Sequence, residues 1–226
     1  MANSKTTKNA PEAQSAFNQK EAFVLKYKNA LIACVAVIII AVLAFVYFGN
    51  KAESKKNEAS AKMAVAESMF SMALQTNDSI SFARCLGDSL GNGGFLEIID
   101  EYGTNVAKLY AGLCYAHMGQ WDEADNYLNQ FKDAGDEEVS PAALFALGNV
   151  YAHKEQYDQA VETLKKAATK ADNNSLSPLC LKAAGEILEF QGKKAEALAL
   201  YKQIKEKYVN STLYQQIDQY ILRATE

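Results

Sequence analysis

The chain has two histidines, His117 and His153, which stand 36 residues apart. Imidazole is the side chain that most often binds a metal ion or transfers a proton near neutral pH. If the two histidines lie on adjacent helical hairpins, about 9–10 Å separates them, the usual distance between packed helices. One metal ion cannot bridge that distance, so we expect no metal site and no cofactor.

Acidic side chains that could work in pairs occur at residues 100–101, 122–123 and 137–138. The members of each pair are adjacent in sequence, so on a helix they point to different sides and cannot act on one substrate. No serine or cysteine lies in a recognisable nucleophile motif. The sequence therefore predicts a protein that is not an enzyme and whose carboxylates are solvated.

Four glycines between residues 87 and 94 could form a ligand-binding loop. A calcium loop starting at Asp88 would need oxygen ligands at its third and twelfth positions, where Leu90 and Ile99 stand. A phosphate-binding loop would need a lysine after the last glycine, and none follows. We therefore expect a plain connector between two helices.

The four cysteines are Cys34, Cys85, Cys114 and Cys180. Cys34 belongs to a long apolar run, which leaves three in the rest of the chain, and three cannot all pair internally. No two of them have the spacing of a zinc or redox motif. We expect small buried apolar side chains, which argue weakly against a strongly oxidising compartment.

Composition favours helices and excludes one class of partner. The formal net charge is −4, so the chain lacks the basic surface expected of a nucleic-acid-binding protein. Hydrophobic residues make up 49%, enough for a core, and only 3 of the 226 residues are proline. So few helix breakers predict an all-α protein.

An uncharged apolar run occupies residues 30–48. As a helix it would be roughly 28 Å long, close to the thickness of a bilayer's hydrocarbon core. We predict a transmembrane helix over residues 29–49, after a polar tail at 1–28 whose first 16 residues are disordered. A cleaved signal peptide, a lipoprotein signal at Cys34 and a buried core helix fit less well.

Lysines on the two sides of this run are almost balanced, with three in the twenty residues before it and four in the twenty after Asn50. The count slightly opposes a cytoplasmic N-terminus. Long domains, however, cross the membrane largely regardless of charge. The lysine count therefore leaves two locations open for the C-terminal domain. Either the domain is extracytoplasmic, or it is cytoplasmic and docks a protein complex at the membrane.

Three segments of the C-terminal half repeat one pattern: residues 109–128, 145–164 and 181–201. In each, a glycine is followed twelve residues later by an alanine, and the spacing between segments is 36 and then 37 residues. Small side chains at both positions let the two helices of a hairpin approach closely, and stacked hairpins bury their apolar faces together. The predicted packing positions are Gly112, Ala124, Gly148, Ala160, Gly185 and Ala197.

This pattern resembles the tetratricopeptide repeat (TPR), a helix–turn–helix unit of 34 residues. The resemblance places repeats at 105–138, 141–174 and 178–211, with a juxtamembrane helix and a degenerate hairpin over 50–104. Residues 212–226 resemble the helix that caps such an array. The consensus proline that ends each repeat is absent. The fold implied is a TPR-like α-solenoid behind the transmembrane helix.

A short tail, one span and a TPR domain together resemble the bacterial YfgM-like family. The resemblance implies a protein of the cell inner membrane with a cytoplasmic N-terminus and an extracytoplasmic domain, associated with the translocon and with periplasmic chaperoning. The partners implied are other proteins, as membrane or translocating clients, and the lipid bilayer through residues 30–48.

In TPR proteins the first helix of each hairpin lines a concave groove. The corresponding positions here form a mixed apolar and polar surface, suited to a helix or an extended segment of another protein. Of the residues that bind a partner's C-terminal carboxylate in some TPR proteins, only Asn149 is matched, so we expect no carboxylate recognition. The predicted groove residues are Leu109, Leu113, His117, Phe145, Asn149, His153, Lys182, Glu186 and Phe190.

Overall fold

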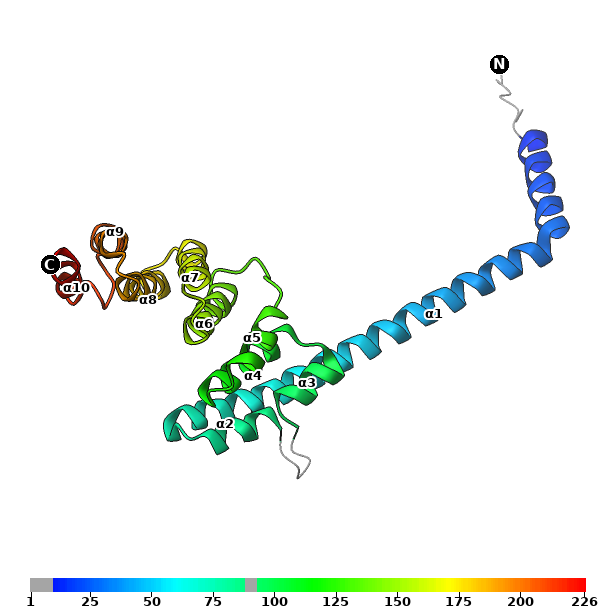
Figure 1. Cartoon of the computed structure of the whole chain (residues 1–226). Coiled ribbons are helices and arrows are strands. Elements are labelled where there is room, and N and C mark those ends of the chain that lie inside the picture. Colours follow the sequence, from blue (N-terminus) through cyan, green and yellow to red (C-terminus); the bar gives the residue numbers. More distant parts are fainter. Residues whose placement is uncertain (1–9, 88–92) are drawn as a thin grey trace, which may run out of the picture. The chain divides into compact units, whose positions relative to one another are not determined.

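Ten helices account for most of the chain in the computed structural model (Figure 1), which describes residues 10–87 and 93–226, with side chains from residue 38 onward. No strand occurs among these residues, so the predicted all-α class is confirmed. The chain divides into two compact units, Met1–Lys55 and Lys56–Glu226. The helices are α1 (Ala10–Thr76), α2 (Ser79–Leu86), α3 (Phe95–Tyr102), α4 (Asn105–His117), α5 (Trp121–Asn129), α6 (Val139–His153), α7 (Tyr157–Ala171), α8 (Leu176–Phe190), α9 (Lys194–Lys207) and α10 (Ile217–Thr225).

The first unit contains the first part of α1, which begins at Ala10. Residues 1–9 of the predicted tail lie outside the described residues, and residues 10–16, predicted to be disordered, are helical. Pro11 is compatible with this start, because the first turn of a helix needs no N–H from it.

Within the part of the chain that the structure describes, no helix is long and apolar enough to cross a bilayer. The side chains of residues 30–37, which make up the first part of the predicted span, lie outside the described residues. Those from Ile38 to Phe48 are described, and almost all of them are exposed.

In the second unit, α4 pairs with α5, α6 with α7 and α8 with α9, and each hairpin packs on the next. Figure 1 shows α6 and α7 side by side in yellow-green and yellow. Buried side chains of neighbouring hairpins share apolar clusters: Leu164 of α7 belongs to the cluster of α8 and α9, and Leu109 of α4 to that of α5 and α6. The core therefore continues along the array, as expected for a repeat protein.

The second unit begins with the end of α1, which packs with α2 and α3 against α4 through a cluster that includes Phe70, Phe82 and Phe95. The predicted connector between α2 and α3 has its central residues, 88–92, outside the described residues. Its two ends touch, because a Cβ on Gly94 would overlap backbone atoms of Cys85 and Leu86. Only glycine allows that approach.

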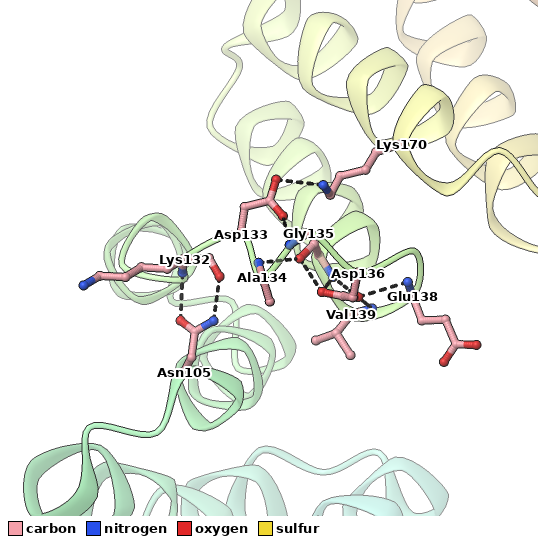
Figure 2. Close-up of polar contacts among 10 residues, drawn as sticks. Asn105, Lys132, Asp133, Ala134, Gly135, Asp136, Glu138, Val139 and Lys170 are labelled. Atoms are coloured by element: carbon pink, nitrogen blue, oxygen red, sulfur yellow. Dashed lines mark hydrogen bonds and ion pairs between the residues drawn. The ribbon is translucent and has the colours of Figure 1, made fainter.

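The linker between α5 and α6 shows how a repeat ends without the consensus proline (Figure 2). The Asp136 carboxylate accepts hydrogen bonds from the backbone N–H groups of Val139 (2.5 Å) and Ser140 (3.0 Å) at the start of α6. The Ser140 hydroxyl and these N–H groups hold the pKa of Asp136 well below its usual range. In the next linker, Asn173 does the same for α8, accepting from Leu176 N–H at 2.8 Å.

The C-terminal segment departs from the single capping helix predicted over 212–226. Residues 212–216 form hydrogen-bonded turns, and α10 starts at Ile217, whose side chain is buried against α9. The Ser211 hydroxyl accepts a hydrogen bond from the Leu213 N–H (3.1 Å), which favours a turn over a continuous helix. The helix α10 then covers the last hairpin, with Arg223 ion-paired to Glu189 of α8.

Candidate protein-binding groove

The three hairpins share one internal contact. In each, a glycine of the first helix faces a large side chain of the second, and a Cβ on the glycine would overlap that side chain. The overlap would be at 2.6 Å from Cγ of Leu128 and 2.7 Å from Cγ of Leu164 in the first two hairpins. The facing pairs are Gly112 with Leu128, Gly148 with Leu164, and Gly185 with Tyr201.

The alanines of the pattern occupy the crossing points of the same hairpins. All three are completely buried, and the backbone oxygens of Ala124 and Ala160 lie 3.3 and 3.4 Å from the Cβ positions of the first two glycines. In the first two hairpins the helices therefore touch at backbone distance. The repeat places the first helices of all three hairpins in equivalent positions. The alanines are Ala124, Ala160 and Ala197.

The predicted groove residues differ widely in how accessible they are. Leu109 is only 6% exposed and belongs to the core between α4, α5 and α6, so a partner cannot reach it. Five positions are half-buried, and three at the ends of the first helices are exposed. The half-buried residues are Leu113, Phe145, Asn149, Lys182 and Glu186; the exposed ones are His117, His153 and Phe190.

The three exposed side chains contact rings on helices that come before their own in the chain, namely α5, α2 and α7. The His153 ring lies flat on Trp121, with centroids 3.9 Å apart, and His117 lies on Phe82 in the same way at 4.3 Å. Phe190 is tilted against Tyr157 at 5.2 Å. These side chains therefore join successive helical layers through ring contacts, which stabilise the stack beyond simple burial.

The two histidines belong to this stack. One face of the His117 ring is covered by Phe82 although the side chain as a whole is exposed, and this loss of solvent lowers its pKa below the ordinary value, which favours the neutral form. Among the residues that the structure describes, no three metal-binding side chains gather in one place.

Polar groove residues bond mainly within the chain. Lys182 forms an ion pair with Glu186 at 2.8 Å on the same helix, and its ammonium lies 5.0 Å from the centre of the Tyr220 ring of α10. The Asn149 amide donates to the backbone oxygen of Phe145 at 3.0 Å. Phe190, at 75% exposed, is thus the most accessible apolar group of the predicted set.

Ion pairs between successive hairpins were missed by the sequence analysis. Lys170, in the last turn of α7, reaches back to Asp133 in the preceding linker at 2.8 Å (Figure 2), and Lys207 of α9 reaches Asp172 at 2.5 Å. The two lysines stand 37 residues apart, the same spacing as Gly148 and Gly185. That recurrence was the available signal, although a surface lysine carries little information by itself.

A cavity of about 380 Å³ between α5, α6 and α7 was also missed. Its floor includes Leu128, Leu144 and Leu147, and its rim includes Lys166 and Glu162. It lies beside the end of α5, a helix of 9 residues where α7 has 15. The early end of α5 leaves this space, and no pattern in the sequence predicts where α5 stops.

Stacked hairpins with glycine–alanine crossings define a helical repeat protein. The sequence matches the family of the tetratricopeptide repeat-like domain over residues 21–223. The chain therefore belongs to that family, and the predicted TPR architecture is confirmed. A comparison with curated proteins gives no match. TPR-like domains are in general protein-binding modules, so this chain carries the architecture of a protein-interaction scaffold.

Proposed function

We propose that the protein is a membrane-anchored scaffold that binds other proteins in the groove of its TPR-like domain. The observation that carries the proposal is Phe190, which ends α8 with three quarters of its surface exposed. Half-buried Phe145 and the Lys182–Glu186 pair stand on the corresponding helices α6 and α8. An apolar anchor beside oriented charges suits an amphipathic helix or an extended segment of a partner.

Membrane attachment through residues 30–48 is the second part of the proposal. Between Ile38 and Phe48 the large apolar side chains of α1 are exposed on all sides of the helix, with Phe45 at 81%. Water disfavours so large a continuous apolar surface, whereas bilayer lipid accommodates it. Lysines flank the run on both sides and supply the charged ends of a span.

The side of the membrane follows from the resemblance to the YfgM-like family. We propose a cytoplasmic N-terminus and an extracytoplasmic domain that assists protein translocation, folding or assembly at the inner membrane. A cytoplasm-facing docking platform is the second candidate. The free, buried thiols of Cys85, Cys114 and Cys180 favour it, because reducing compartments keep thiols unpaired.

Attachment and sidedness are tested on intact cells and membranes. We expect the chain to resist extraction by alkaline carbonate, and added protease to cut the domain only after the outer barrier is opened. Release by carbonate would refute the anchor. Protection of the domain until the inner membrane is broken would instead support the cytoplasmic platform.

Binding in the groove is tested by placing a photo-crosslinking amino acid at position 190 in the full-length protein. The control is position 209, where Val209 is also exposed, at 53%, but lies after α9. We expect specific crosslinked proteins from position 190 and none of them from position 209. Charge reversal at Lys182 and Glu186 should change these crosslinks; an identical pattern from both positions would refute the groove.

A further inference from the structure

The register of α2 against α4 is fixed by one stacked pair. The Phe82 ring lies on the His117 ring, with an interplanar angle of 6°. One turn further along α2 stands Cys85, and one turn back along α4 stands Cys114. Residues three apart share a helix face, so both cysteines lie on the faces through which α2 and α4 pack on each other.

The two thiols meet inside an apolar core. Cys85 is 1% and Cys114 0% exposed, and both belong to the cluster built around Phe70, Phe82 and Phe95. The two thiols interact, because each affects the pKa of the other, and the Cys85 thiol donates a hydrogen bond to the backbone oxygen of Ser81 at 3.2 Å. Both side chains therefore point into the same small space.

We propose that Cys85 and Cys114 are a modification site, at which a disulfide compound converts the two free thiols into a disulfide that joins α2 to α4. The bond would close a loop that contains α3 and would fix the first helices of the second unit to the repeats. Cys180 takes no part, because it lies in the separate apolar cluster of α8 and α9. The proposal goes beyond the proposed function and holds on either side of a membrane.

The reaction is thiol–disulfide exchange. One cysteine thiolate attacks a sulfur of the donor disulfide, which forms a mixed disulfide and releases the first donor thiolate. The second cysteine thiolate then attacks the cysteine sulfur of that mixed disulfide and releases the second donor thiolate. Cys85 and Cys114 together lose two electrons and two protons, and the donor disulfide gains them as two thiols.

Burial decides when this exchange takes place. It raises the pKa of both thiols above their ordinary values, so the folded domain holds few thiolates. A donor also has no path to buried sulfur atoms while α2 stays packed on α4. Exchange therefore belongs to folding, or to local opening of α2, and is slow in the closed domain.

The test refolds the full-length protein in detergent from urea, in parallel buffers that contain oxidised or reduced glutathione. Remaining thiols are alkylated, and peptides are mapped by mass. We expect a linked peptide pair containing Cys85 and Cys114 from the oxidising buffer only. The thermal midpoint of the linked protein should rise by roughly 5–10 °C, from the constraint on a loop of about 30 residues. Full alkylation of both cysteines after oxidising refolding would overturn the proposal.

Variants separate the pair from the other thiols. Cys180→Ala is the matched control, since it removes a buried cysteine and should leave the link intact. Cys85→Ala and Cys114→Ala should each abolish the link and the rise in midpoint. A link that contains Cys180 in the unmodified protein would contradict the assignment, and that measurement needs no variant to fold.

The same trapping separates this inference from the proposed location. Acid-quenched cells are alkylated before and after reduction. A pair that links in the refolding test but is fully alkylated in cells would place the domain in a reducing compartment, and the extracytoplasmic location would fail while the site stands. Absence of the link in the refolding test refutes the site and leaves the location to the protease experiment.

Discussion

The repeat array (α4 to α9) and the aromatic cluster that precedes it (around Phe70, Phe82 and Phe95) both bury an apolar core, but they do so in opposite ways. In the array, small side chains recur at fixed spacing, and helices meet at backbone distance, as where Gly148 faces Leu164. In the aromatic cluster, large rings fill the space: Phe95 lies flat on Tyr110 at 5.0 Å, and Phe70 meets Phe82 edge-on at 5.8 Å. Packing in the array depends on positions where the side chain is small or absent, whereas packing in the cluster depends on large aromatic side chains.

The two regions are therefore vulnerable to opposite substitutions. Adding one methyl group damages the array, because packed backbones cannot move apart without shifting every following layer. Removing a ring damages the cluster, because neighbouring rings cannot fill so large a space.

The largest effect is expected for Phe95→Ala. The ring is fully buried and touches both Phe70 and Tyr110, so its loss should lower the free energy of unfolding by about 3–5 kcal/mol. Hydrogen exchange should accelerate mainly in α2, α3 and residues 56–76. Leu222→Ala, at a side chain that is 62% exposed, is the control and should change stability by less than about 0.5 kcal/mol. Equal acceleration in α6 to α9 would show that the cluster and the array unfold as one unit.

Gly148→Ala should have the next largest effect. The new Cβ would lie 2.7 Å from Cγ of Leu164, and the repacking should cost about 1–3 kcal/mol. Gly49→Ala is the matched control, since it adds the same methyl group to a helix at a position with no atom within 4 Å. Urea unfolding measures both.

A double-mutant cycle tests the cause of that loss. Leu164→Ala removes the atoms that the new methyl group meets, so Gly148→Ala should cost much less in its presence than in the native chain. Strict additivity of the two losses would show that the glycine acts through backbone freedom rather than through helix contact.

The two linkers of the array provide a third test, because Asp136 caps α6 and Asn173 caps α8. Asp136→Ala and Asn173→Ala should each cost about 1 kcal/mol at neutral pH. The pKa of Asp136 is lower in the folded protein than in the unfolded chain, where it is about 3.9. The contribution of Asp136 is therefore complete above pH 4 and is lost as the pH falls through its folded pKa.

Unfolding measured from pH 7 downward checks this sign. The difference in the free energy of unfolding between the native protein and Asp136→Ala should become smaller below pH 4. The corresponding difference for Asn173→Ala should stay constant, since an amide does not titrate. A gap for Asp136→Ala that persists at the lowest pH would mean that the neutral carboxyl group caps α6 equally well.

The same contrast explains how far the sequence could predict the structure. Gly112 and Ala124 stand in one hairpin and recur with their partners, so spacing alone indicates the repeats and their helices. The contact of Phe82 with His117 involves α2, which lies before the three repeats, so no recurring spacing indicates it. For that reason the groove residues at the helix ends could be located, but the stacking of His117 on Phe82 could not be foreseen.

The end of α5 shows a second limit. Residues 130–132 are compatible with a helix by composition, yet α5 stops at Asn129. The Asn105 side chain donates to the backbone oxygen of Lys132 at 2.6 Å and accepts from its N–H at 2.7 Å (Figure 2), which holds the linker backbone outside a helix. A contact between residues 27 positions apart overrides local preference there, and the neighbouring cavity follows from it.

The smallest effect is expected for the ion pairs that join hairpins. Lys170→Met removes the pair with Asp133, whose carboxylate is 58% exposed, so solvent and salt already screen the attraction. We expect the thermal midpoint to fall by less than about 3 °C at low salt and the difference to vanish at 1 M salt. Lys62→Met, which breaks the pairs with Glu97 and Glu101 beside the aromatic cluster, should also have a small effect that vanishes at 1 M salt.

If both substitutions have small effects that salt removes, charge does not distinguish the two regions. Close helix contact then sets the stability of the array, and ring contact sets that of the aromatic cluster. A large loss for Lys170→Met that salt leaves unchanged would reverse this conclusion for the array. The linker would then hold the hairpins in register, and the glycine contacts would only permit the approach that the Lys170–Asp133 pair enforces.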